Sequence, residues 1–248
     1  MYKIKYLFEN DKARLIFIFS KNLLTDKKDL VKLIEEYYNK TDFEIYNELK
    51  KFNYKAVHGA AKIDSVKRII KLHEVDTNTY LDVGCHKGEI TKSISKYFKI
   101  KKENIYGIDI KKYCELPFKF NTFNFSKIPY LDNTFDLVTC FMVLHHCPSH
   151  DILLKEIFRV MKTGGILIVR EHSCDTKTDE ALLDVLHEFY DYILYSGHNS
   201  WKTCYNSEKY WTKKITDVGF ELFKPIYIKD AVSNPLRNYI SIFVKLRP

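Results

Sequence analysis

Apolar residues along this chain follow two spacings, one typical of strands and one typical of helices. From about residue 60, segments of the two kinds alternate. Short, continuously apolar runs predict buried strands, whereas longer runs with an apolar residue every three or four positions predict helices. The predicted strands cover 79–84, 104–110, 118–125, 135–144, 166–172, 220–228 and 238–246. The predicted helices cover 61–72, 89–98, 150–162, 177–195 and 208–218.

This alternation predicts an α/β fold of the Rossmann-like kind, with a mostly parallel sheet of seven strands and helices on both faces. The last two strands follow each other without a helix, so we expect them to form an antiparallel pair at one edge of the sheet. Gly164-Gly165 is predicted to end the helix at 150–162, while Ser207 caps the helix at 208–218 and Gly219 ends it.

The first 55 residues have a different pattern. Two β-prone runs flank the turn at 10–12 and predict a β-hairpin, and two helices follow, the second opened by the capping box at 41–44. No low-complexity or Pro/Gly-rich linker separates this region from the rest of the chain. We therefore expect an N-terminal extension over 1–55 that docks on a main domain over 56–248 and offers a contact surface for a partner or for a second copy of the chain.

Composition limits the class of protein. With 46% hydrophobic and 15% aromatic residues, the chain has ample material for a core. The net charge of +8 fits an anionic partner such as RNA, but an AT-rich genome enriches lysine equally well. The six cysteines form no C-x-x-C pair, which favours reduced thiols. No apolar run is long enough to cross a bilayer, so we expect a cytoplasmic protein without a membrane partner.

Candidate chemistry begins at the turn G-C-H-K-G, which joins the strand at 79–84 to the helix at 89–98. In an open α/β sheet, ligands bind at the carboxyl ends of the strands, where Gly84 and Gly88 lie. Asp109 ends the next strand, where a carboxylate accepts both hydroxyls of an adenosine ribose. NAD-binding and S-adenosylmethionine-binding domains share this pair of signals.

His86 separates the two cofactors, because it stands where the dinucleotide fingerprint has its middle glycine. That glycine gives a pyrophosphate room to approach the backbone. S-adenosylmethionine has no phosphate, and Asp82 at the strand end is placed to meet its ammonium group. The turn therefore favours S-adenosylmethionine over a dinucleotide and over a purely structural turn.

The stretch from "YLDVGCHKG" through "NIYGIDI" to "NFSKIPYLDNTFDLVTCFMVLHHCPSHDILLKEIFRVMKTGGILIVRE" resembles the class I S-adenosylmethionine-dependent methyltransferases, and within them the methyltransferase type 11 group. The resemblance extends over residues 60–245 in the order of elements. It implies an enzyme of the transferase class with S-adenosyl-L-methionine as cofactor. The implied cofactor-binding residues are Asp82, Gly84, Cys85, His86, Gly88, Asp109, Ile110, Asn124, Phe125 and Phe141. His86 replaces a glycine of the family pattern, and Asn124 stands where an aspartate is common.

Acceptor-side candidates follow the predicted strands 135–144 and 166–172, which read "HHCP" and "REH" at their ends. We assign His146, Glu171 and His172 as candidate catalytic residues, and His145, His187, Trp201 and Tyr205 as candidate substrate-binding residues. Three interpretations stay open: loop-fastening and supporting residues, a general base or orienting group, or a metal site. No diagnostic ligand spacing supports the metal, so none is predicted.

The methyl acceptor is predicted to be RNA, through its cap, a base or a terminus, on the basic charge and on the aromatic segment 195–211. Two interpretations of this segment stay open: a lid whose aromatic rings stack on the acceptor, or a loop whose aromatic rings pack it onto the sheet. The alternatives are a small molecule or a protein side chain as acceptor, or a non-catalytic methyltransferase-like subunit that binds RNA or stimulates a partner.

Overall fold

The computed structural model describes residues 77–113, 115–176, 179, 180, 183, 203–227 and 238–246. The predicted extension over 1–55, the predicted helix at 61–72 and the candidate residues His187 and Trp201 lie outside these residues. The described residues up to 173, together with 206–227 and 238–246, belong to one compact unit. Residues 174–176, 179, 180, 183 and 203–205 belong to a second unit, which is considered by itself.

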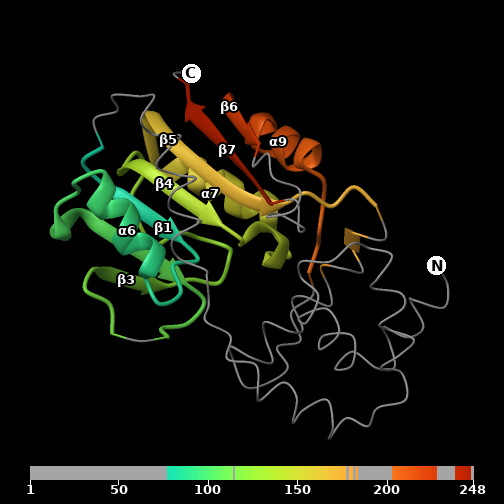
Figure 1. Ribbon diagram of the computed structural model, residues 1–248. Coiled ribbons are helices and arrows are strands. Elements are labelled where there is room, and N and C mark those ends of the chain that lie inside the picture. The colour runs from blue at the N-terminus through green and yellow to red at the C-terminus, as the bar shows by residue number, and fades with distance from the viewer. Residues whose placement is uncertain are drawn as a thin grey trace, which may run out of the picture. The chain divides into compact units, whose positions relative to one another are not determined.

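The first unit contains a sheet of seven strands in the order β3-β2-β1-β4-β5-β7-β6 (Figure 1). The strands are β1 (Tyr80–Val83), β2 (Ile105–Asp109), β3 (Lys119–Thr122), β4 (Phe135–Phe141), β5 (Met161–His172), β6 (Phe220–Tyr227) and β7 (Asn238–Lys245). Strands β1 to β5 pair parallel with one another, whereas β7 pairs antiparallel with both β5 and β6. The expected antiparallel edge pair and the seven-stranded mixed sheet are thus confirmed.

Helices connect the strands as the sequence pattern indicates. Helix α6 (Glu89–Tyr97) joins β1 to β2, with the 3₁₀ turn η1 (Lys102–Asn104) before β2. The 3₁₀ turn η2 (Leu144–His146) and helix α7 (His150–Val160) join β4 to β5, and α9 (Glu208–Asp217) precedes β6. The Ser207 hydroxyl accepts a hydrogen bond from the Tyr210 N–H at 3.2 Å, which is the predicted N-cap of α9.

The two faces of the sheet are covered by different helices. Ile94 of α6 shares a core with Ile168 of β5 and Ile242 of β7, which point to the same face. Lys245 has the opposite parity in β7, and its ammonium group donates to the carbonyl of Phe158 in α7 at 2.8 Å. Helices α6 and α7 therefore lie on opposite faces, as Figure 1 also shows.

Predicted boundaries are wrong at three places, the first being the end of β3, which lies at Thr122 rather than residue 125. Helix α7 ends at Val160, and β5 begins at Met161 and continues through Gly164-Gly165, which do not stop the helix. Pairing supplies the reason, since Met161 aligns with Phe135 of β4 across an irregular register and Gly164 adopts a φ of 78° within the strand. Strand β4 ends at Phe141 rather than residue 144, because Met142 adopts a φ of 60° and turns the chain into η2.

In the second unit, Thr176 and Asp179 form a reciprocal cap, with the Thr176 N–H donating to the Asp179 carboxylate at 3.0 Å and the Asp179 N–H to the Thr176 hydroxyl at 3.1 Å. Residues 179, 180 and 183 are helical, so the helix predicted at 177–195 begins here, and most of its length lies outside the described residues. No helix among the described residues is long and apolar enough to cross a membrane.

Candidate functional site

The turn after β1 is held against the end of β2 by backbone hydrogen bonds. The amides of Gly84 and Cys85 both donate to the Ile108 carbonyl, at 2.8 and 3.1 Å. The Gly88 amide then closes the turn on the Cys85 carbonyl at 2.8 Å, and α6 begins with the next residue. The start of α6 is therefore fixed beside the carboxyl ends of β1 and β2, where the sequence predicts the cofactor.

Both glycines of the turn are needed for their backbone conformation and for space. Gly84 and Gly88 have φ values of 75° and 71°, which strain any residue with a Cβ. A Cβ on Gly84 would lie 2.2 Å from Cγ2 of Val143, and a Cβ on Gly88 would lie 2.7 Å from the Phe118 ring. The turn is consequently packed against the loop after β4 on one side and the segment before β3 on the other.

Asp109 fastens the middle of the turn to the end of β2. Its carboxylate accepts the N–H of His86 at 2.8 Å and the N–H of Ile110 at 2.7 Å. Burial raises the pKa of Asp109, while these backbone donors oppose the rise. The ring of His86 lies against Tyr113, with ring centroids 4.2 Å apart. His86 thus serves the turn through its backbone N–H, and its own φ of 47° shows how tight the turn is.

Asp82 lies beneath the turn and is only 3% exposed. Its two carboxylate oxygens accept hydrogen bonds from the hydroxyls of Thr91 in α6, at 2.5 Å, and Thr139 in β4, at 2.7 Å. The Tyr80 hydroxyl extends this network to Thr139 at 2.7 Å. Burial, opposed by the two hydroxyl donors and supported by the neighbouring Asp109 carboxylate, raises the pKa of Asp82 to about 6.

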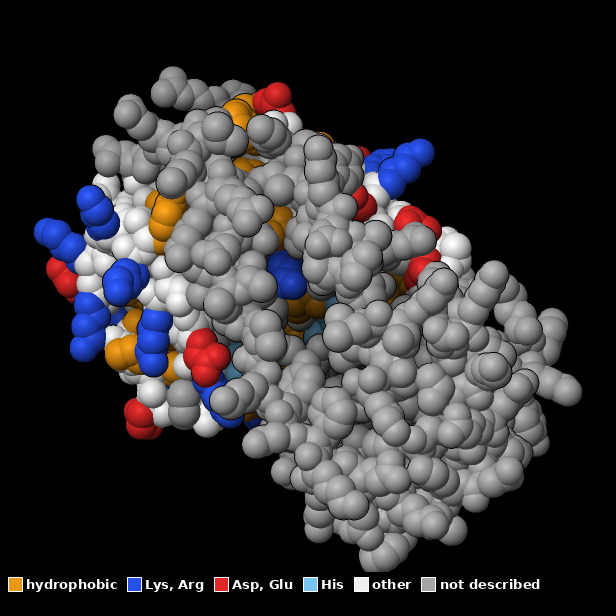
Figure 2. All heavy atoms as spheres, viewed as in Figure 1, with side chains coloured by type: hydrophobic (Ala, Val, Ile, Leu, Met, Phe, Trp, Pro, Cys, Tyr) orange, Lys and Arg blue, Asp and Glu red, His pale blue; other side chains and the backbone are white. Residues whose placement is uncertain are grey.

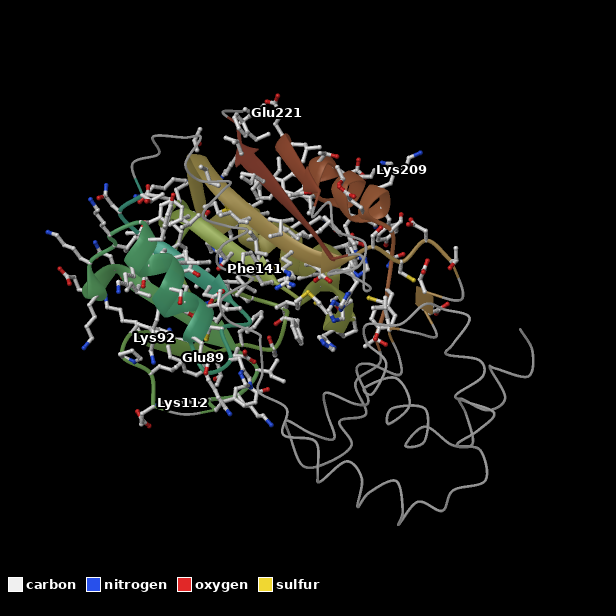
Figure 3. All side chains as sticks on the ribbon, viewed as in Figure 1. Glu89, Lys92, Lys112, Phe141, Lys209 and Glu221 are labelled. Atoms are coloured by element: carbon white, nitrogen blue, oxygen red, sulfur yellow. The ribbon has the colours of Figure 1, made fainter. Side chains whose placement is uncertain are left out.

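The remaining cofactor candidates lie around this centre. Cys85 is buried against Gly107, and Phe141 is buried at the end of β4 in the core shared with α6 (Figure 3). Asn124 is exposed and bonds the Ser126 amide at 3.2 Å. Phe125 has a φ of 63°.

The acceptor-side candidates come together where the parallel strands β4 and β5 end. Glu171 is fully buried, and its Oε1 accepts the amide N–H groups of Val143 at 3.0 Å and Leu144 at 2.7 Å. Its Oε2 lies 2.5 Å from Nδ1 of His145. Burial raises the pKa of Glu171 to about 7, against the lowering effect of these donors.

Three histidine rings lie together at this end of the sheet, and one of them, His145, contacts the Glu171 carboxylate. The ring of His145 lies 4.1 Å from that of His146 and 5.3 Å from that of His172, measured between centroids. His145 and His172 are 1% and 4% exposed, so they are part of the interior at this end of the sheet. Within the described residues, no group of three His, Cys, Asp or Glu side chains is arranged to hold a metal ion.

Tyr205 and Trp211, two aromatic residues of the segment 195–211, are among the described residues. Trp211 is fully buried in α9, where its ring packs against His150 with centroids 5.1 Å apart. It therefore fills the core, as an aromatic residue on the buried face of a helix does, and is not part of a lid. Tyr205 is half-buried in the segment before α9 and belongs to the second unit.

Four residues of the site are not predicted from the sequence. Thr91 and Thr139 hold Asp82, Tyr113 stacks on His86, and Val143 covers Gly84. Thr139 carries a signal that was available, since it is a polar residue inside an apolar strand next to a predicted site. Tyr113 carries none, because it follows its strand in a segment whose conformation the pattern does not specify. Val143 carries none either, because the pattern places it in a strand that in the structure ends at Phe141.

The residues of the turn fit S-adenosylmethionine. Its sulfonium and ammonium groups are positive, and the turn presents two buried carboxylates, Asp82 and Asp109, whose pKa values are raised by burial. A cation beside such carboxylates stabilises their ionised form, whereas a pyrophosphate would be repelled. Asp109 accepts three backbone N–H groups, those of His86, Ile110 and Lys111, so about one of its four acceptor positions is left for a ribose hydroxyl.

Comparison with known proteins agrees with this geometry. Residues 81–169 match the family described as a methyltransferase domain. The ubiquinone/menaquinone biosynthesis C-methyltransferase UbiE of Rickettsia bellii is 27% identical over 194 residues, which cover 71% of this chain and 73% of that protein. A sterol 24-C-methyltransferase of Kluyveromyces lactis is 28% identical over 117 residues, covering 42% and 31% of the two chains.

Solved structures share the fold. An S-adenosylmethionine-dependent methyltransferase of Thermotoga maritima superposes with a TM-score of 0.56 at 15% identity, covering 82% of this chain and 96% of its own. One of Methanosarcina mazei has a TM-score of 0.51 at 20% identity, covering 73% and 98%. The family match, the strand order and the turn between β1 and α6 together assign the domain that contains residues 81–169 to the class I S-adenosylmethionine-dependent methyltransferases.

Proposed function

We propose that this enzyme transfers a methyl group from S-adenosylmethionine to a small organic acceptor at the carboxyl ends of β4 and β5. The observation that carries the proposal is the pair of matches to a methyltransferase of ubiquinone/menaquinone biosynthesis and to one of sterols, since quinones and sterols are small and largely apolar. These matches do not support RNA, the acceptor that the basic charge of the sequence favours.

The cofactor supplies an electrophilic methyl group on a positively charged sulfur, so the protein has mainly to hold and align the two reactants. Asp82, Gly84, Gly88 and Asp109 are the residues proposed to hold the cofactor. Water exclusion comes from the buried end of β4, where Phe141 is 7% exposed.

The acceptor-side histidines are the remaining candidates for proton transfer. In the structure Glu171 is engaged by the loop after β4, and Nδ1 of His145 is engaged by Glu171. A base is needed only if the acceptor loses a proton on methylation. We assign that role to His146 or His172. Glu171 is therefore not a catalytic residue in this proposal.

RNA remains a second candidate because of one surface. The α6–η1 lysine face consists of exposed lysines that form no ion pair with any described residue, namely Lys92, Lys96, Lys99, Lys101 and Lys102. Elsewhere in the described residues, Lys162 and Lys214 pair with Asp136 and Asp151 at 2.8 and 2.9 Å. Figure 2 shows blue side chains gathered over the part of the molecule that carries α6. Lysines gathered on one face suit a phosphate backbone.

Methyl transfer from radiolabelled S-adenosylmethionine distinguishes the candidates. The enzyme is incubated with separate pools of cellular RNA, protein and solvent-extracted small molecules. We expect label in the small-molecule pool, and the same label when the five lysines of the α6–η1 face are changed to glutamine. Label in RNA that disappears in this variant would overturn the small-acceptor proposal in favour of RNA. Label in protein alone would overturn both.

The sequence also predicts a cytoplasmic location and a contact through the N-terminal extension. The extension lies outside the described residues, and both expectations stay predictions.

A further inference from the structure

The carboxylate of Glu171 is engaged by a single loop. Its Oε1 accepts two successive amides, those of Val143 and Leu144, at 3.0 and 2.7 Å, and its Oε2 bonds the ring of His145 at 2.5 Å. A further backbone donor, the N–H of His172, also lowers the pKa of this carboxyl. An ionised carboxylate has about four acceptor positions, so these donors fill them. Glu171 is fully buried. A carboxylate with no acceptor position left is suited to holding structure and not to removing a proton from a substrate.

The loop that Glu171 holds is strained and needs an anchor. Met142 adopts a φ of 60°, where a side chain is unfavourable, and its own N–H donates to the Arg170 carbonyl at 2.8 Å. The next two amides open the short 3₁₀ turn η2, and amides at the start of such a turn have no acceptor within it. The Glu171 side chain supplies that acceptor from the neighbouring strand.

The same loop contacts the cofactor turn. The Val143 side chain occupies the space beside Gly84, where a Cβ would lie only 2.2 Å from Cγ2 of Val143. The amide of Val143 is one of the two that Glu171 holds. A chain of direct contacts therefore runs from Glu171 in β5, through Val143, to the turn after β1.

We propose that Glu171 is a positioning residue for cofactor binding: it latches the loop after β4 onto Gly84, so that the turn between β1 and α6 keeps the shape that S-adenosylmethionine requires. Glu171 touches neither reactant and acts through Val143. Because this role concerns cofactor affinity alone, its test needs no acceptor and does not depend on the acceptor proposed above.

Calorimetry with S-adenosylmethionine tests the latch. Glu171→Ala removes the acceptor of both amides and is expected to weaken S-adenosylmethionine binding about tenfold. A tenfold change in affinity corresponds to about 1.4 kcal/mol, the size expected for losing hydrogen bonds that hold the loop. Glu171→Gln keeps one oxygen for the two amides and an N–H₂ group for Nδ1 of His145, and it is expected to bind within threefold of the wild type. This rescue distinguishes the latch from a role of the negative charge.

The matched control for Glu171→Ala is Asp136→Ala. The Asp136 carboxylate also accepts two successive amides, the N–H groups of Thr79 at 2.9 Å and Asn78 at 3.2 Å. These residues lie at the amino ends of β1 and β4, away from the carboxyl ends where the cofactor turn lies. We expect this variant to lose thermal stability and to keep its affinity for the cofactor within twofold.

A second measurement applies if Glu171→Ala does not fold. Glu171→Asp keeps the charge but shortens the side chain by one methylene, which withdraws the carboxylate from the two amides. Hydrogen exchange of the Val143 and Leu144 amides should then accelerate at least tenfold, together with weaker cofactor binding. The proposal would be overturned if both Glu171→Ala and Glu171→Asp bound S-adenosylmethionine with wild-type affinity. If Glu171→Ala does not fold, wild-type affinity of Glu171→Asp alone would overturn it. Equal weakening by Asp136→Ala would overturn it as well.

Discussion

The change Gly84→Ala adds one methyl group at the most constrained position of the cofactor turn. Two costs are expected. An alanine at the observed φ of 75° loses about 1–2 kcal/mol relative to glycine. The new methyl would lie 2.2 Å from Cγ2 of Val143, and forcing extra volume into a packed site costs about 1–3 kcal/mol. We therefore expect Gly84→Ala to lower the free energy of unfolding by about 2–5 kcal/mol.

Gly164→Ala is the matched control, because Gly164 has a φ of 78° and no heavy atom lies within 4 Å of the position that its new methyl group would take. It should cost only the conformational part, about 1–2 kcal/mol. The difference between the two variants measures the clash with Val143 directly. Denaturant unfolding at equilibrium, with both variants compared at equal m-value, gives the two free energies.

A double-mutant cycle measures the clash between the new methyl group and Val143 separately from the cost of the backbone conformation. In a Val143→Ala background the methyl on Gly84 has room, so the added cost of Gly84→Ala should fall by about 1–3 kcal/mol. Equal destabilisation by Gly84→Ala and Gly164→Ala, with no coupling to Val143, would refute the reasoning that this contact shapes the turn.

Three further predictions concern the described fold. In the folded protein the pKa of Asp82 is raised from 3.8 to about 6, so its contribution to stability, at most about 3 kcal/mol, is present below pH 4 and is lost as the pH rises through 6. Asp82→Asn should flatten the dependence of the free energy of unfolding on pH, and an unchanged slope would contradict the raised pKa of Asp82. Lys245→Met removes the ammonium group that bonds the carbonyls of Phe158 in α7 and Met161 at the start of β5, and should cost about 2–3 kcal/mol in chemical denaturation. A neutral effect would show that water replaces the ammonium group. Arg159→Ala breaks the bonds to Glu156 and Asp132 and should lower the free energy of unfolding by about 2 kcal/mol. Because Arg159 is partly exposed, this loss should shrink in high salt, and a loss that salt leaves unchanged would point to packing instead.

Most of the sheet was predictable because strands β1, β2, β4 and β5 are short apolar runs separated by regular helical patterns. Two of the boundary errors fell at ends where local signals compete with pairing. Gly164-Gly165 has the composition of a helix stop, yet the chain had already left the helix at Val160 to pair with β4. Likewise the apolar run continues past Phe141, and only the conformation of Met142 ends the strand.

The site was predictable where chemistry is tied to a position in the fold. Gly84 and Asp109 follow strands whose ends are fixed by the pattern, so their proximity could be inferred. The role of Glu171 could not, because nothing in the sequence indicates that its oxygens accept amides 28 and 27 residues away along the chain. Nor could the burial of Trp211, since a segment rich in aromatic residues suits a lid and a core equally well.

Binding of S-adenosylmethionine by the turn between β1 and α6 is the central claim. Isothermal titration of the protein with S-adenosylmethionine and with NAD tests it most directly, with Asp109→Ala as the site variant and Asp217→Ala, at the exposed end of α9, as the control. We expect binding of S-adenosylmethionine and none of NAD, weakened about tenfold to a hundredfold by Asp109→Ala and unchanged by the control, since a charge-assisted hydrogen bond contributes about 1.5–3 kcal/mol. Failure to bind S-adenosylmethionine, or an affinity that Asp109→Ala leaves unchanged, would contradict the account.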